Sequence, residues 1–150
     1  MISTPYDAWI MQEDGRLSER IVNEYHRLNL SNPPRLSWVS TVDKALSALD
    51  HKPYDLVIVM ARTADREAYA SAERIKKKNS AQLVALLIHR ELPKEDVHPT
   101  WEIPSVVDQT FVWSGNTDIL LAMIKTAEDF MNIDRDTTIA GIRVIILVED

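Results

Sequence analysis

The chain has 150 residues, 45% of them hydrophobic and 27% charged, with a formal net charge of −6. These values suit one soluble globular domain, and the acidic balance argues against a nucleic-acid-binding surface, which usually needs a basic patch. The absence of cysteine excludes disulfides and thiolate chemistry, and no apolar run approaches the roughly 20 residues of a membrane span, so we expect a cytoplasmic protein without a membrane partner.

Helical and strand-like patterns alternate along the chain. In chain order the sequence predicts one long helix or two consecutive helices over 6–30, a strand over 36–40, a helix over 42–50, a strand over 54–60, a helix over 65–78, strands over 82–88 and 106–113, a helix over 118–132, and a strand over 144–148. Thr41 is expected to cap the second helix. Residues 91–104 are predicted to be a loop and 133–141 a polar connector. Such alternation favours a parallel sheet covered by helices on both faces.

The last predicted strand is unusual, because five consecutive apolar residues over 144–148 run directly into Glu149 and Asp150. A run without polar alternation is typical of a central parallel strand that is buried on both faces. In α/β proteins the carboxyl ends of such strands carry the chemistry. We therefore expect the functional residues of this fold at strand ends.

Residues 54–60, Tyr-Asp-Leu-Val-Ile-Val-Met, resemble the third strand of response-regulator receiver domains. Residues 40–46, 82–89 and 108–114 resemble the start of the second helix and the fourth and fifth strands of the same family. The resemblance implies an α/β, three-layer, flavodoxin-like fold with a doubly wound parallel sheet of five strands in the order 2-1-3-4-5. It also implies a regulatory role in bacterial signalling, exerted through protein–protein contacts.

The departures from the receiver pattern are as informative as the match. The position of the phosphate-accepting aspartate holds Met60, and the position of the receiver lysine holds Trp113. Ile88 stands where the family has a hydroxyl residue, and Ser3 and Thr4 stand near the place of its acidic metal-binding pair. Without these groups nothing stabilises a transferring phosphoryl group, so we expect a pseudo-receiver with no enzymatic activity, cofactor or bound metal.

A narrower resemblance rests on residues 5–8 (Pro-Tyr-Asp-Ala), 13–21 and 111–113 (Phe-Val-Trp). These are similar to the N-terminal segment of bacterial proteins in which receiver-like modules precede a phosphoenolpyruvate synthase-like, PEP/pyruvate-binding region. The resemblance implies a pseudo-receiver over 1–139, followed over 140–150 by a linker and the first strand of a second receiver. Glu149 and Asp150 would then belong to the metal-binding pair of that second domain.

The first strand of a receiver lies in the middle of its sheet, and this chain begins too late to form it, since Met1 and Ile2 precede Ser3, Thr4 and Pro5. An empty central position would expose the backbone groups of both neighbouring strands. We therefore expect the strand over 144–148 to complete the sheet, either in the same chain or by exchange between two chains. The alternative is that this segment only opens the next domain.

Two further hypotheses concern single residues. Arg62 and His89, at the ends of two predicted strands, form a candidate anion site, and an anion- or small-ligand-sensing regulatory domain is the alternative function. Trp101, Phe111 and Trp113 form a candidate interface for a protein partner, a neighbouring domain or a second copy of the chain. Internal packing of these aromatic rings is the other interpretation.

Overall fold

The protein is described by a computed structural model, in which residues 1–14, 16–28, 32–62, 65–89, 105–116 and 118–143 are placed. Its centre is a parallel sheet of three strands in the order β1 (Leu56–Arg62), β2 (Leu83–His89) and β3 (Gln109–Trp113). Five consecutive residues of β2 are buried, as expected for a strand that is covered on both faces.

The free edge of β1 is occupied by the first residues of the chain. Ile2 forms parallel bridges with Val59 of β1 on one side and with Val39 on the other. The order across the sheet is therefore the one that the receiver resemblance implies, but the described residues form three strands rather than five, and isolated bridges hold the other two positions. The expectation of a vacant central position is wrong at Ile2, because two residues suffice to bridge both neighbours. The predicted strand over 144–148 lies outside the described residues.

Six helical segments surround the sheet in the described part of the chain. They are α1 (Pro5–Trp9), the π-helical turn η1 (Ile10–Asp14), α2 (Leu17–Arg27), α3 (Val42–His51), α4 (Arg66–Lys78) and α5 (Asp118–Thr138). Arg16 adopts the left-handed conformation (φ 43°, ψ 43°) immediately before α2, so the N-terminal helical region is divided rather than continuous. Thr41 caps α3 as predicted, since its side chain accepts a hydrogen bond from the Lys44 N–H.

The prediction of a polar connector over 133–141 is wrong, because α5 continues to Thr138. No proline or glycine interrupts this stretch before Gly141, and exposed Asp, Arg and Thr residues tolerate a helix. Gly141 then takes a positive φ of 65°, and the Ile142 N–H bonds back to the Asp136 carbonyl oxygen at 3.0 Å, as at many helix ends.

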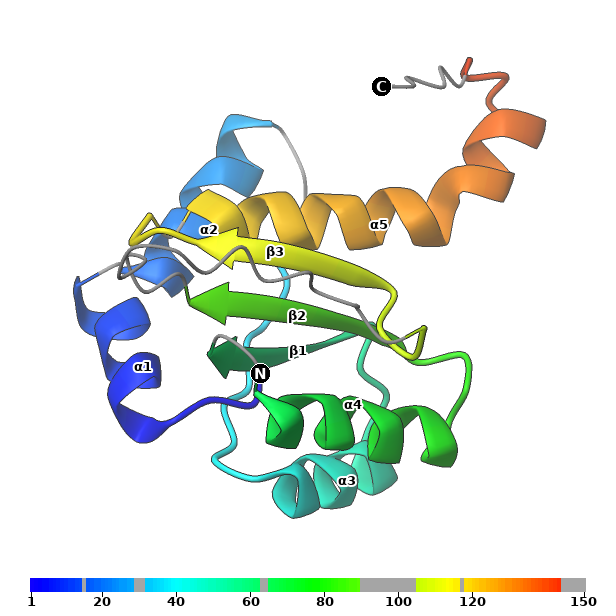
Figure 1. Cartoon of the computed structure of the whole chain (residues 1–150). Helices are drawn as coiled ribbons and strands as arrows, with labels where there is room; N and C mark the ends of the chain where they lie inside the picture. Colours follow the sequence, from blue (N-terminus) through cyan, green and yellow to red (C-terminus); the bar gives the residue numbers. More distant parts are fainter. Residues whose placement is uncertain (15, 29–31, 63–64, 90–104, 117, 144–150) are drawn as a thin grey trace, which may run out of the picture.

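The elements form three layers, with α3 and α4 on one face of the sheet and α2 and α5 on the other (Figure 1). Alternate residues of β1 enter the two cores, since Val57 and Val59 pack towards α3 and α4 while Ile58 packs towards α2 and α5. This mixed α/β architecture is consistent with a flavodoxin-like fold. Among the described helices, none is long and apolar enough to cross a membrane.

Candidate functional site at the carboxyl edge of the sheet

The carboxyl ends of the three strands meet in one row. Arg62, His89 and Trp113 are register partners across β1, β2 and β3. Neighbouring strands lie about 4.8 Å apart, and register partners point to the same face, here the face that α2 and α5 cover. The structure therefore brings together the two residues of the predicted anion site and the residue at the predicted lysine position.

The position of the phosphate acceptor lies two residues before this row. Met60 is half-buried and packs against the apolar core between the sheet, α2 and α5. Its register partners are Leu87 and Phe111, so the row in which a receiver would hold a carboxylate is apolar across all three strands. A thioether in this setting offers neither a charge nor a nucleophilic oxygen.

Trp113 is 4% exposed and packs inside the domain. The ring of His89 meets it edge-on, with centroids 5.1 Å apart and an interplanar angle of 66°. Its indole Nε1 has no hydrogen-bond partner in the described part of the chain. Trp113 therefore packs internally, which is the other interpretation that the sequence allowed for this residue. Phe111 is partly buried against the same core, and Trp101 lies outside the described residues.

Arg62 is exposed at the end of β1 and leads into the start of α4. Asp65 caps that helix, with its side chain accepting hydrogen bonds from the Glu67 and Ala68 N–H groups at 3.0 and 3.1 Å. The same carboxylate accepts a long bond of 3.5 Å from the Arg62 backbone N–H. Asp65 therefore caps α4 and holds the backbone at the end of β1, where Arg62 is exposed.

The place of the receiver's acidic pair holds neutral residues. Ser3 is buried, and its N–H donates to the Val39 carbonyl oxygen at 3.1 Å. Thr4 caps α1 by accepting from the Asp7 N–H at 3.1 Å. Within the described ranges no three His, Asp or Glu side chains lie close enough to hold a metal ion. Glu149 and Asp150 fall outside those ranges.

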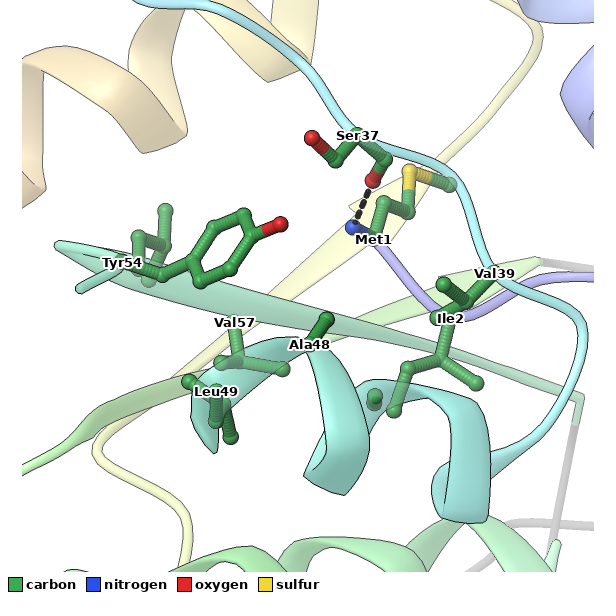
Figure 2. A pocket seen from close by; sticks show the side chains of 10 residues that line it. Met1, Ile2, Ser37, Val39, Ala48, Leu49, Tyr54 and Val57 are labelled. Atoms are coloured by element: carbon green, nitrogen blue, oxygen red, sulfur yellow. Dashed lines mark hydrogen bonds between the residues drawn. The ribbon is translucent and has the colours of Figure 1, made fainter. Parts of the chain in front are cut away.

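Sequence reasoning did not find the hollows at the opposite, amino edge of the sheet. Two of them border Met1, whose backbone amine donates a 2.6 Å hydrogen bond to the Ser37 carbonyl oxygen (Figure 2). Burial lowers the pKa of this amine to about 6. In the sequence, the two residues before Ser3 pointed to this region, because they fall at the central strand position. They suggested that this position is empty, and not that hollows lie beside it.

The comparisons with known proteins support the fold. No protein-family model matches the sequence, and no curated protein sequence matches it. Among solved structures, the chain is similar to one from the crystal structure of histidine kinase ThkA in complex with response regulator protein TrrA, at 21% sequence identity and a TM-score of 0.51. The likeness covers 76% of this chain and 87% of that one. At this identity the likeness establishes the fold alone, and it agrees with the receiver-like topology.

Proposed function

We propose that this chain is a receiver-like regulatory domain that accepts no phosphoryl group and acts in bacterial two-component or phosphorelay signalling through protein–protein contacts. The observation that carries the proposal is Met60, packed with Leu87 and Phe111 where a receiver would hold its acceptor carboxylate. The solved neighbour, a complex of a histidine kinase with a response regulator, supports the signalling context. The PEP/pyruvate-binding assignment and the division at residue 139 rest on the sequence resemblance.

Phosphoryl transfer to an aspartate needs the carboxylate, a metal ion beside it and a cation that meets the added charge. The described residues supply Met60, the neutral pair Ser3–Thr4 and the buried indole of Trp113 at the corresponding places. None of these groups provides the charge that the reaction needs. These residues therefore support a module that does not accept a phosphoryl group at this position.

Contact with a partner is supported by apolar side chains on the distal half of α5 and just beyond it. The exposed large hydrophobic residues there are Phe130, Met131, Ile133, Ile139 and Ile142. Phe130 and Ile133 are three residues apart and so share one face of the helix. Exposed apolar side chains that lie close together often mark a surface that binds another protein. A second copy of the chain or a neighbouring domain is the proposed occupant.

Incubation with acetyl phosphate and Mg²⁺, and separately with beryllofluoride and Mg²⁺, tests the proposal. A phosphorylatable receiver treated in parallel is expected to gain the mass of one phosphoryl group, whereas this chain is expected to keep its mass and its amide chemical shifts. Met60→Asp is the matched variant, because it restores the carboxylate alone. It too should remain unmodified, since Trp113 supplies no cation. Stoichiometric phosphorylation of the parent chain would overturn the proposal.

The alternative function, an anion-sensing regulatory domain, is favoured by the shared row of Arg62 and His89. Phosphate oxygens would accept from the guanidinium and from the ring of His89, which is half-buried against Trp113. Titration with orthophosphate and pyrophosphate tests this alternative by amide and imidazole chemical shifts. Shifts centred on these two residues that vanish in Arg62→Gln would support it. Unchanged spectra at millimolar ligand would exclude it.

A further inference from the structure

A stripe of side chains runs from the middle of α5 to its end, beside the face of the helix that packs on the sheet. Its members are spaced by four, three and four residues, at Thr126, Phe130, Ile133 and Thr137. This spacing keeps side chains on one side of an α-helix, and it is the spacing by which helices contact other helices. Phe130 and Ile133 are exposed, and both threonines are half-buried. The stripe is therefore accessible to a partner.

Both threonine hydroxyls of the stripe are already bonded within the helix. Thr126 Oγ1 donates to the Ala122 carbonyl oxygen at 2.8 Å, and Thr137 Oγ1 donates to the Ile133 carbonyl oxygen at 2.7 Å. Such bonds to the preceding turn satisfy the hydroxyl donor without a partner molecule. The threonine methyl groups can then join Phe130 and Ile133 in an apolar contact.

Carboxylates flank the stripe on both sides. Asp129 and Asp136 are seven residues apart, and helical periodicity puts them on one side of Ile133. Asp134 lies on the other side, next to Phe130. Among the described residues, no ion pair engages any of these three carboxylates. The apolar stripe therefore has an acidic rim whose charges are available to a partner.

The stripe lies clear of the sheet. The second half of α5 extends past the edge at which the strands begin (Figure 1). The buried residues of α5 all belong to its first half, and they are Leu120, Met123, Ile124 and Ala127. From Thr126 to Thr137 the stripe is about 16 Å long, which is three helical turns. Arg135, the one basic residue between positions 126 and 138, projects from the opposite side of the helix.

We propose that the partner of this stripe is an amphipathic helix whose apolar face is flanked by lysine or arginine. Its apolar residues cover Phe130 and Ile133, and its basic side chains meet Asp129, Asp134 and Asp136. Complementary charges at the rim of such a contact select the partner and speed its association. The inference rests on the proposed function, because it names the chemistry of the protein surface that the domain contacts.

A second copy of the chain is the weaker occupant of the same stripe. In a pair of helices, the residues that flank one contact stripe meet those that flank the other. Two copies would therefore bring their aspartates together in either orientation, and like charges across a contact disfavour that pairing. Self-association through this face is thus confined to high protein concentration.

Binding of two synthetic peptides to the full chain tests the proposal. Each peptide is a helix of about four turns with leucine at the contact positions, and one carries lysine at the flanking positions where its twin carries glutamate. We expect the lysine peptide to bind at least about tenfold more tightly at low salt, because its charges are opposite to the rim. Amide chemical shifts should change mainly along α5. Absence of binding, equal dissociation constants for the two peptides, or shifts centred elsewhere would overturn the proposal.

Charge variants of the chain separate a local effect from the overall charge of −6. Asp129→Asn with Asp134→Asn removes two charges beside the stripe. The matched control is Glu67→Gln with Glu73→Gln, which removes two exposed charges from α4 on the other face of the sheet. We expect the first pair of changes to weaken the lysine peptide at least about fivefold and the control less than about twofold. Equal losses would mean that the net charge alone holds the peptide, which overturns the proposal.

Self-association gives a second measurement that does not depend on the design of a peptide. Asp129→Asn with Asp134→Asn relieves the repulsion between two copies, so we expect sedimentation equilibrium to show a dimer at least about threefold tighter than that of the parent chain. An unchanged dimer, or a parent dimer tighter than the complex with the lysine peptide, would overturn the choice of partner. The acetyl phosphate test of the proposed function does not involve α5, so either proposal can fail alone.

Discussion

The amine of Met1 donates a 2.6 Å hydrogen bond to the carbonyl oxygen of Ser37, 36 residues away in the sequence. This contact, the bridges of Ile2 and the bond from the Ser3 N–H hold the segment around Val39 against β1. The amine is buried, and burial lowers its pKa from 8.0 to about 6. Met1 and Ile2 are therefore part of the sheet.

A buried amine with a lowered pKa makes stability depend on pH. In the unfolded chain the amine keeps a pKa near 8.0, so between pH 6 and pH 8 the unfolded state binds more protons than the folded state. Stability then rises with pH through this window, by up to roughly 2.7 kcal/mol for a difference of two pKa units. Urea denaturation of the free-amine chain and of an N-terminally acetylated chain at several pH values measures this rise. The histidines contribute equally to both chains, so identical pH profiles would contradict the prediction.

Tyr25 of α2 and Glu128 of α5 join the two helices that cover one face of the sheet. The Tyr25 hydroxyl donates to the Glu128 carboxylate, and Lys125 lies 3.0 Å from Glu128 Oε2 and 4.1 Å from the centroid of the Tyr25 ring. Burial, together with this carboxylate, raises the pKa of Tyr25. Removing only the hydroxyl, by Tyr25→Phe, should lower the free energy of unfolding by about 1–2 kcal/mol.

The matched control for this prediction is Tyr6→Phe, because Tyr6 is 67% exposed. Its effect should stay within about 0.5 kcal/mol. Both values come from urea denaturation followed by circular dichroism. A loss in Tyr25→Phe no larger than in Tyr6→Phe would mean that the bond to Glu128 contributes nothing to the packing of α2 on α5.

Sequence patterns predicted most of the helices and strands, because apolar runs and helix caps are formed by residues that are neighbours in the sequence. Five buried residues in a row identify β2, and Thr41 identifies the start of α3 by the acceptor that its hydroxyl offers. The extension of α5 to Thr138 was missed because its last residues are polar and exposed, which a helix tolerates as well as a loop does. The bridges of Ile2 were missed because two residues carry no periodicity.

The sequence predicted where the candidate site lies, but it did not predict how the side chains of the site pack. Parallel strands place their carboxyl ends together, so the sequence alone brings Arg62 and His89 to one edge. The sequence does not show whether the neighbouring aromatic side chain, that of Trp113, is buried or exposed. Trp113 is buried since its register puts it on the face covered by α2 and α5, and that register depends on contacts between strands distant in sequence.

Asp108 connects the start of β2 to α4. Its carboxylate accepts from the Val84 N–H at 2.7 Å and lies 2.7 Å from Lys76 Nζ, and the two charged side chains are only 31% and 16% exposed. Asp108→Ala would leave the Val84 donor without its partner, so we expect a loss of about 1–3 kcal/mol. Asp43→Ala removes the exposed pair with Arg74 and should cost less than about 1 kcal/mol. Equal losses in urea denaturation would show that the Val84 bond is not what Asp108 contributes.

The distal half of α5 provides the test of association. Phe130 and Ile133 are 60% and 47% exposed and lie on one face of the helix, so a second copy of the chain can cover them. Replacing both by lysine puts two charges on that face without touching the core. We expect light scattering to show a dimer for the parent chain at high concentration and a monomer for the double variant, with melting temperatures within about 2 °C. Asn132→Lys, exposed on the same helix, should leave the dimer intact. If the double variant keeps the mass of the parent chain, this face is not the one through which the protein associates.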